Sequence, residues 1–364
     1  MEGMEVRISN VDRSFWQGKR VFITGHTGFK GSWLSLWLQS LDCTLKGYSL
    51  KPETEPSLYE LASIEEDMES EFGDIRDIKT LSNSINNFNP QIIIHLAAQP
   101  LVRKSYQNPI ETFETNVMGT VNVLEASRNC KSLKTILVIT TDKCYDNKEW
   151  DWAYRENEPM GGYDPYSSSK GCAELIVSSY RRSYFNDLNI SIATARAGNV
   201  IGGGDWSTDR LIPDILKAFE KSEKVTIRNP KAIRPWQHVL ECLSGYLILC
   251  EYLYKYGSEY AEAWNFGPND TECVSVEHIV QKLSQYWGEE AQWEIDSSKQ
   301  PHEAKYLKLD CSKAKNKLNW APKWNLDETL ESIVDWHKVY LNSDNIKIHT
   351  LKTINRYNLN GHEG

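Results

Sequence analysis

Tyr166 and Lys170 stand four positions apart in the run Tyr-Ser-Ser-Ser-Lys. Two residues at this spacing share one face of a helix. An ammonium group close to a phenol lowers the pKa of the phenol, so that a tyrosine can accept a proton near neutral pH. The same pair also occurs on many solvated helix faces, so its interpretation depends on what surrounds it.

A glycine-rich turn, Gly25-His-Thr-Gly-Phe-Lys-Gly31, lies upstream of the pair. It follows an expected strand over 20–25 and opens an expected helix over 31–41. Gly25 permits a tight turn, Gly28 lets the backbone approach a pyrophosphate, and Gly31 allows the helix to pack closely on the strand. The helix N-terminus then favours an anion. The alternative is an ordinary strand-to-helix loop. With Tyr166 and Lys170, the turn predicts a nicotinamide enzyme that removes a proton from an alcohol as hydride leaves the same carbon.

Thr141, Asp142 and Lys143 follow directly after an apolar run that predicts a strand. Ligands of open α/β sheets bind at the carboxyl ends of such strands. Thr141 can donate a hydrogen bond to a substrate oxygen, and Asp142 can act as an acid. The simpler alternative is that Asp142 and Lys143 form a solvated loop pair.

The elements that must position these residues alternate along the first 200 positions. Apolar runs predict strands over 20–25, 44–50, 91–98, 135–141 and 189–196, and another strand that ends at 71–74. Amphipathic stretches such as 112–128 predict helices between them. This alternation predicts an α/β fold with a doubly wound, parallel Rossmann-type sheet. After Asn199 the elements become shorter, which predicts a smaller, mixed α/β C-terminal lobe. We therefore expect a dinucleotide-binding domain over 15–198, to which segment 236–262 returns, and a substrate lobe over 199–350.

Charge and composition exclude several classes of protein. The formal net charge of −9 argues against nucleic acid as the main partner, so that an anionic ligand needs a local basic patch. No apolar run is long enough to span a membrane, and the N-terminus is not typical of a signal peptide. The eight cysteines are scattered, without a C-x-x-C pair, which favours reduced thiols and no metal site. The expected location is the cytoplasm.

The turn and the Tyr-x-x-x-Lys pair together resemble the extended short-chain dehydrogenase/reductase family. The resemblance covers nearly the whole chain and implies NAD as the cofactor. By this resemblance Asp74 and Ile75 hold adenine, and Lys170 holds the nicotinamide ribose. The full implied set of cofactor-binding residues is Gly25, Thr27, Gly28, Phe29, Lys30, Gly31, Asp74, Ile75, Leu96, Ala97, Ala98, Gln99, Asn116, Tyr166 and Lys170.

Further segments are similar to the CDP-glucose branch of the nucleotide-sugar 4,6-dehydratases. They are 26–31, 141–146, 161–166, 199–205, 233–238 and 301–304. This resemblance implies CDP-glucose as the substrate, oxidation at C4, loss of water across C5–C6 and return of hydride to C6, in deoxysugar and surface-polysaccharide biosynthesis. Thr141, Asp142, Lys143, Tyr166 and Lys170 would be catalytic. Another nucleotide-sugar dehydratase, a 4-epimerase, a cofactor-sensing regulator and a structural oligomer subunit are the alternatives. The last two do not need this full catalytic set.

Two departures from the family pattern leave questions open. Related dTDP-glucose enzymes have a glutamate where this chain has Lys143, so Lys143 either takes the C5 proton as a neutral base or stays charged and stabilises the enolate. The segment 47–51 has no acidic residue at the end of the second strand, which leaves NADP possible on physical grounds.

Substrate contacts and assembly complete the expectations. Arg234 is the first candidate for the substrate diphosphate, because guanidinium matches phosphate in a fork. The other expected substrate contacts are Ser105, Asn199, Arg210, His302 and Glu303. His95 is expected to be a core histidine. The helices over 112–128 and 165–184 carry apolar residues beyond the needs of one core, including Val121, Leu124, Leu175 and Ile176. They predict a homodimer or homotetramer through a four-helix bundle.

Overall fold

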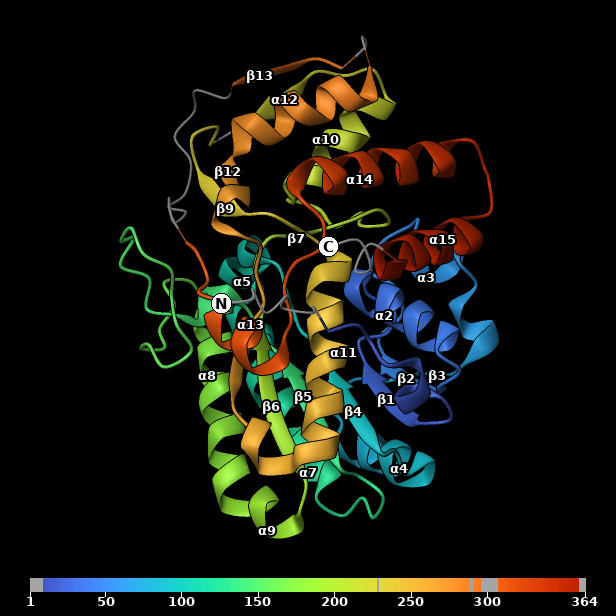
Figure 1. The fold of residues 1–364 in the computed structure, drawn as a ribbon, viewed down its shortest axis with the longest axis vertical. Helices are drawn as coiled ribbons and strands as arrows, with labels where there is room; N and C mark the ends of the chain where they lie inside the picture. Colours follow the sequence, from blue (N-terminus) through green and yellow to red (C-terminus); the bar gives the residue numbers. More distant parts are fainter. Residues whose placement is uncertain (1–8, 228, 289–290, 296–306, 360–364) are drawn as a thin grey trace, which may run out of the picture.

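A parallel sheet forms the centre of the molecule (Figure 1). The computed structural model describes residues 9–227, 229–288, 291–295 and 307–359. Within them, the sheet has seven strands in the order β11-β6-β5-β4-β1-β2-β3, and every neighbouring pair is parallel. The strands are β1 (Arg20–Thr24), β2 (Thr44–Ser49), β3 (Glu69–Phe72), β4 (Ile92–His95), β5 (Thr135–Ile139), β6 (Ser191–Arg196) and β11 (Ala263–Asn265). The prediction of a doubly wound parallel sheet is confirmed.

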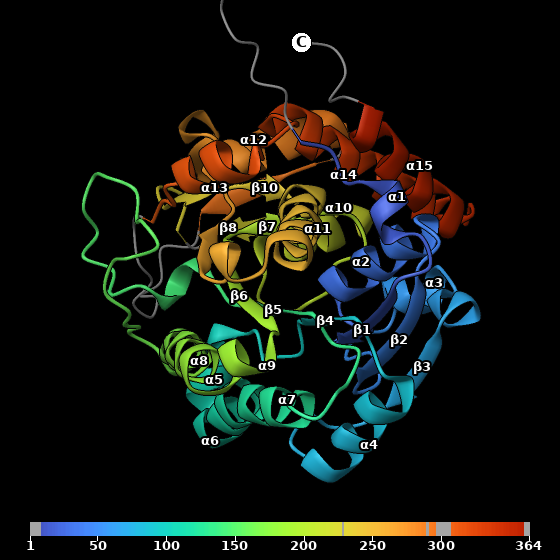
Figure 2. The same cartoon turned by 60° about the horizontal axis from the view of Figure 1, so that its bottom comes forward.

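Helices cover both faces of this sheet (Figure 2). On one face lie α2 (Phe29–Ser40) and α11 (Val239–Tyr256), and on the other α4 (Ile78–Phe88), α7 (Gly119–Ser127) and α8 (Pro165–Tyr180). Side chains alternate along β1, so that Val21 and Ile23 enter one hydrophobic core and Phe22 enters the other. Because both faces are covered, central strands such as β4 and β5 are nearly continuous apolar runs rather than alternating ones, whereas the edge strand β3 is polar.

Strand order reverses between β1 and β4. The chain runs outward from β1 through β2 to β3, then crosses back to β4 on the other side of β1. The loops after β1 and β4 therefore diverge and leave a crevice at the carboxyl edge, which is where ligands of open α/β folds bind.

The start of α8 is set by its own sequence. Asp164 caps the helix by accepting a hydrogen bond from the Ser167 amide at 2.9 Å, and Pro165 occupies the first helical position, where its missing N–H costs nothing. These two residues place Tyr166 in the first turn. The expected helix over 112–128 begins earlier, as α6 (Pro109–Phe113), and passes through a widened turn at Glu114–Met118 before α7.

The segment after residue 236 supplies β10 (Gln237–His238), α11 and then β11. α11 packs against β5 and β6, and β11 extends the sheet beside β6. β11 is a strand that the sequence patterns did not predict, because its three residues are too few to show a period.

A smaller lobe lies beyond the carboxyl edge of the sheet, at the top of Figure 1. Its core joins α10 (Leu211–Glu220), α12 (Val276–Trp287) and α14 (Leu326–Leu341). Its short strands form three pairs. They are β7 (Val200–Ile201) with β10, β8 (Val225–Ile227) with β13 (Trp293–Ile295), and β9 (Ile233–Pro235) with β12 (Cys273–Ser275).

Helix α15 (Ile346–Leu359) packs against both α2 and α14. The Trp336 indole of α14 donates a hydrogen bond to the Thr350 hydroxyl of α15 at 2.9 Å. The remaining short helices are α1 (Arg13–Trp16), α3 (Leu58–Leu61), α5 (Val102–Gln107), α9 (Asn186–Leu188) and α13 (Ser312–Leu318). None of the helices in the described ranges is long and apolar enough to cross a membrane.

Candidate active site

Two adjoining cavities lie at the carboxyl edge of the sheet. One, of about 350 Å³, is lined by the glycine turn and the loops after β2, β3 and β4, and we call it the cofactor cavity. The other, of about 360 Å³, lies between the sheet edge and the smaller lobe, and we call it the sugar cavity. Six residues line both cavities: Lys30, Pro100, Leu101, Tyr166, Asp205 and Arg210. Tyr166 therefore stands on the boundary between the two.

The glycine turn has the shape that a dinucleotide diphosphate needs. Gly25 has φ +79°, and a Cβ there would lie 2.7 Å from the Ala97 amide nitrogen. A Cβ on Gly31 would lie 2.0 Å from the Gly25 carbonyl oxygen. Only glycine fits at either position, so the backbone amides at the start of α2 stay open to a ligand. This cradle fits the diphosphate of a dinucleotide.

Nearly all of the residues predicted for the cofactor line the cofactor cavity. They are Gly25, Thr27, Gly28, Phe29, Lys30, Gly31, Asp74, Ile75, Leu96, Ala97, Ala98, Gln99, Tyr166 and Lys170. Asn116 is the exception, since it is not among the described residues that line this cavity. Asn116 is buried. Its side-chain oxygen accepts a hydrogen bond from the Gln99 amide, and its side-chain nitrogen donates hydrogen bonds to the Gln99 carbonyl and the Ser169 hydroxyl. Asn116 thus fastens the loop after β4 to α8 from behind.

The end of β2 has no acidic residue, and hydroxyl and carbonyl groups there contact the glycine turn. The Thr27 hydroxyl lies 2.9 Å from the Ser49 hydroxyl and donates a hydrogen bond to the Leu50 carbonyl at 2.9 Å. Lys51 and Glu53 also line the cofactor cavity, two residues apart and opposite in charge. The nearest carboxylate beyond β2 therefore comes from the loop at Glu53 rather than from the strand.

Tyr166 is a buried phenol beside Thr141. Burial raises the pKa of Tyr166 to about 12, although a hydrogen bond with the Thr141 side chain opposes the rise. The sequence suggested that Lys170 lowers this pKa, but Lys170 is not among the largest influences on it, and the Lys170 ammonium donates a hydrogen bond to the Ile139 carbonyl at 3.1 Å. Desolvation is therefore the dominant influence on the phenol.

Lys170 is also buried, and its charged form is destabilised. Burial lowers the pKa of Lys170 to about 8, and the neighbouring Lys30 ammonium adds to the fall.

His95 is the core histidine that the sequence suggested. Its ring lies 2.6 Å from the Thr24 hydroxyl and 3.2 Å from the Thr120 hydroxyl, and burial lowers the pKa of His95 to about 3.

Asp142 occupies a tight position in the wall of the sugar cavity. The Thr141 hydroxyl donates a hydrogen bond to its carboxylate at 3.0 Å. A Cβ on Gly198 would lie 1.8 Å from the carboxylate, so the glycine makes room for the acid. Asp142 and Lys143 begin a short 3-10 turn (Asp142–Cys144), and both line the sugar cavity. Asp142 is buried and Lys143 half-buried, which argues against a solvated loop pair.

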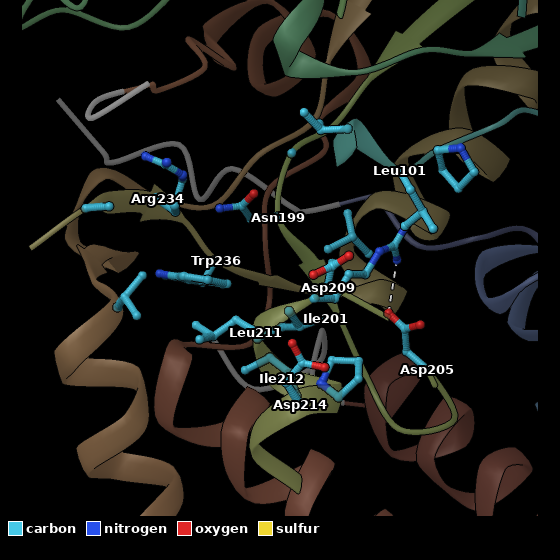
Figure 3. A pocket seen from close by; sticks show the side chains of 18 of the residues that line it. Leu101, Asn199, Ile201, Asp205, Asp209, Leu211, Ile212, Asp214, Arg234 and Trp236 are labelled. Carbon is cyan, nitrogen blue, oxygen red and sulfur yellow. Dashed lines mark hydrogen bonds and ion pairs between the residues drawn. The ribbon is translucent and has the colours of Figure 1, made fainter. Parts of the chain in front are cut away.

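Three of the predicted substrate residues line the sugar cavity: Asn199, Arg210 and Arg234. Figure 3 shows Asn199 and Arg234 in the wall of this cavity. Arg210 forms an ion pair with Asp205 at 3.0 Å. The Arg234 guanidinium donates a hydrogen bond to the Ile233 carbonyl at 2.9 Å. Asn199 lies between β6 and β7, has a left-handed backbone (φ +43°) and lines the sugar cavity.

The other three substrate predictions have different outcomes. Ser105 is fully buried and is not among the described residues that line either cavity; its hydroxyl donates a hydrogen bond to the Val102 carbonyl at 2.6 Å inside α5. The small polar residue serves its own helix, as serine often does. His302 and Glu303 lie outside the described residues.

Lys30 has a wider role than the sequence suggested. It was predicted for the cofactor alone, yet it also lines the sugar cavity. Burial lowers the pKa of Lys30, and the Asp142 and Asp205 carboxylates lie close enough to oppose this. Among the described residues its ammonium has no hydrogen bond and no ion pair. The signal in the sequence is a charged residue inside the glycine turn.

Comparison with known families places this site in context. The family model described as GDP-mannose 4,6 dehydratase matches residues 22–333, which include both cavities. The chain belongs to this family. The resemblance to nucleotide-sugar dehydratases seen in the motifs is thereby confirmed.

Individual proteins are also similar to this chain. A CDP-glucose 4,6-dehydratase of Salmonella typhimurium is 56% identical over 352 residues, covering 95% of this chain and 98% of that protein. A CDP-paratose 2-epimerase of Salmonella typhi is 25% identical over 344 residues, covering 87% of this chain and 98% of that protein.

Solved structures share the fold at lower identity. A dTDP-glucose 4,6-dehydratase of Bacillus anthracis in complex with NAD aligns with a TM-score of 0.74 at 22% identity, covering 90% of this chain and 99% of that one. A UDP-glucose 4-epimerase of Thermotoga maritima aligns with a TM-score of 0.75 at 20% identity, covering 88% and 99%. At this identity the likeness supports the fold alone.

Proposed function

We propose that this chain is an NAD-dependent hydro-lyase that converts CDP-D-glucose to CDP-4-dehydro-6-deoxy-D-glucose in deoxysugar biosynthesis. The observation that carries the proposal is the 56% identity, over 95% of the chain, to a CDP-glucose 4,6-dehydratase. The arrangement of Thr141, Asp142, Lys143 and Tyr166 around one cavity supports it.

Tyr166 is the base for the first step. Its phenolate oxygen takes the proton of the sugar 4-hydroxyl as hydride leaves C4. The Thr141 hydroxyl donates a hydrogen bond to the sugar 4-oxygen. The bound nicotinamide supplies the hydride acceptor and a positive charge, which lowers the pKa of a nearby phenol. The Lys170 ammonium lies one helical turn from Tyr166 and is the group to hold the nicotinamide ribose.

Asp142 is the acid for the elimination. The 4-keto group acidifies the C5 hydrogen, which leaves as a proton to a base, proposed below to be Lys143. Asp142 gives a proton to the 6-hydroxyl, and this hydroxyl leaves as water while the C5–C6 double bond forms. Hydride then returns to C6 and a proton to C5. The reaction is balanced as loss of one water. Asp142 is buried against Gly198, so that it can reach the 6-hydroxyl only from the cavity that it lines.

The nucleotide can be tested directly. The purified protein is incubated with NAD and, separately, with CDP-, dTDP-, GDP- and UDP-glucose, and GDP-mannose. A 4-keto-6-deoxy product is then measured by its absorbance in alkali and by mass. We expect product from CDP-glucose at a rate at least about tenfold above the others. An equal or faster rate with dTDP-glucose would contradict the CDP assignment and leave the reaction class standing.

We propose that Lys143 is the C5 base. It lines the sugar cavity beside Asp142. Lys143→Met should then abolish exchange of the C5 hydrogen with deuterated solvent, whereas Lys143→Glu should keep measurable exchange because a carboxylate can also accept the proton. Lys143→Arg should lose exchange, since guanidinium stays protonated. If Arg retains exchange and Glu loses it, Lys143 is instead a charged stabiliser of the enolate. Wild-type exchange in Lys143→Met would exclude both roles.

We also propose a homodimer or larger homo-oligomer that pairs α7 and α8. Leu175 of α8 and Met118, just before α7, are 62% and 51% exposed, which favours a covered face in the assembly. Of the other residues predicted for this face, Leu124 is buried in the protein's own core and Ile176 packs against it, while Val121 is half-buried.

Sedimentation velocity tests the assembly. At micromolar concentration the protein should sediment as a dimer or tetramer, and Leu175→Glu should shift it toward monomer. Ile348→Glu on α15 provides a control, because Ile348 is similarly exposed, at 52%, on another face. A stable, active wild-type monomer would refute the proposed assembly.

A further inference from the structure

A buried ion pair lies directly beneath the catalytic residues. Glu174 of α8 and Arg196 at the end of β6 form two parallel contacts, each 2.9 Å, and both side chains are at most 5% exposed. Burying two charges costs several kcal/mol before their attraction is counted, and replacing such a pair by apolar side chains is often neutral or stabilising. A core therefore does not need this pair for stability alone.

Every polar group around the pair is satisfied. The Thr140 and Thr194 hydroxyls donate hydrogen bonds to the Glu174 carboxylate, the latter at 2.7 Å. The remaining Arg196 nitrogen donates to the Tyr145 hydroxyl at 2.7 Å and to the Glu156 carbonyl at 3.0 Å. A fully satisfied buried network of this kind accepts one geometry and penalises others.

The members of this network are neighbours of the catalytic residues in the chain. Glu174 follows Lys170 by one helical turn on the same face of α8, Thr140 directly precedes Thr141, and Tyr145 follows the turn that begins at Asp142. Both halves of the site, α8 and the loop after β5, are thus joined to β6 through one pair of charges.

We infer that Glu174 and Arg196 are positioning residues that fix α8 against the loop after β5, and so set Tyr166 and Lys170 relative to Thr141 and Asp142. The inference rests on the proposed reaction. It assigns these two residues a role in the rate of the chemical steps rather than in substrate affinity, because neither lines the described walls of the two cavities.

The carboxylate has an electrostatic effect as well. The charged and titratable groups that face Lys170 are Lys30 from α2, Glu174 from its own helix, Cys144 from the loop after β5 and His95 from β4. Lys30 lowers the pKa of Lys170, whereas Glu174 raises it. Removing the Glu174 charge should therefore move the pKa of Lys170 below its value of about 8. If activity needs the charged ammonium, the fall in activity at alkaline pH will begin at a lower pH.

Glu174→Gln tests both effects. We expect kcat for CDP-glucose to fall about 10- to 100-fold, KM to change less than about threefold, and the alkaline limb of the kcat profile to move down by about half a pH unit or more. Glu174→Asp keeps the charge, so its kcat should fall while the limb stays at the wild-type pH. A purely structural residue would lower the melting temperature and the folded fraction without moving this limb.

Controls keep the outcomes separate. Glu262→Gln removes a more exposed carboxylate, 2.8 Å from Lys313, and should change neither kcat nor the limb. If Glu174→Gln does not fold, Thr194→Val removes one hydrogen bond to the carboxylate and should lower kcat severalfold at unchanged KM. The inference is overturned if Glu174→Gln folds and has the wild-type kcat and the wild-type alkaline limb of the kcat profile. If Thr194→Val is used instead, a wild-type kcat in that variant overturns it. Absence of turnover in the unmodified protein would instead contradict the proposed reaction.

Discussion

Tyr166→Phe should reduce turnover of CDP-glucose by at least about 10²- to 10⁴-fold, the usual contribution of a positioned acid or base. The substitution removes only the phenolic oxygen, which is the group proposed to take the 4-hydroxyl proton. The ring remains to fill the boundary between the two cavities, so that affinity for the nucleotide sugar should change little. Steady-state kinetics give the first quantity, and calorimetric titration with CDP-glucose gives the second.

Tyr163→Phe is the matched control for this prediction. Tyr163 lies three residues earlier, is 78% exposed, and undergoes the same chemical change. Its variant should retain wild-type turnover. Turnover near the wild-type rate in Tyr166→Phe would remove Tyr166 from the mechanism, whereas lost affinity with lost turnover would indicate a binding role.

Asp142→Asn should slow the loss of water more than the oxidation at C4. Asparagine has nearly the same shape but cannot give a proton to the 6-hydroxyl, so a reduction of about 10²-fold or more is expected in that step. In a single turnover the absorbance of reduced nicotinamide should rise and persist, whereas in the wild type it should be brief. Stopped-flow absorbance measures this. An unchanged rate of 6-deoxy product formation would contradict the role of Asp142 as the acid.

Gly198→Ala tests the same acid through its position. The added methyl group would lie 1.8 Å from the Asp142 carboxylate, so the carboxylate must move. Gly198→Ala should therefore show the same persistent absorbance of reduced nicotinamide as Asp142→Asn, although the Asp142 carboxyl group is still present. Asp187→Asn, which changes an exposed carboxylate on α9, should behave as the wild type.

The sequence allowed the sheet to be predicted because each of its first six strands has a visible signal. Most of these strands show an apolar run, and turns or helices with clear periods separate them. The edge strand β3 is polar, and only its end at 71–74 gave a signal. β11 lacks this signal, since only Ala263–Asn265 pair with β6 and their strand character comes from the neighbouring strand. Tertiary context, rather than local preference, makes these residues a strand.

The residues that line the cavities could be predicted where chemistry and motif coincide, as for the glycine turn, Tyr166 and Lys170, whose roles stay predictions. They could not be predicted where the direction of a side chain matters. Ser105 points into its own helix, and Asn116 supports the loop after β4 from behind, so neither faces a cavity. The sequence predicted Lys30 for the cofactor alone, yet Lys30 lines both cavities, because the sequence does not show that the cavities adjoin.

The electrostatics were the least predictable part. Spacing alone suggested that Lys170 lowers the pKa of the Tyr166 phenol, yet burial raises it to about 12. Burial also lowers the pKa of Lys170 to about 8. Both shifts depend on how much protein surrounds each group, and residue spacing carries no such information.

Helix α15 has a consequence for chimeric enzymes. It begins at Ile346, after the last residue that the family model matches, but it packs on α2, the helix that follows the phosphate-binding turn. The Tyr357 ring meets the Trp37 ring of α2 edge-on at 5.8 Å, and its hydroxyl donates a hydrogen bond to the buried Glu241 at 2.7 Å. If the smaller lobe of a relative replaced that of this chain up to residue 333 and the chain ended there, α2 would lose its contacts with α15. Exchange of nucleotide specificity between relatives should therefore carry α15 along with α2, as one module.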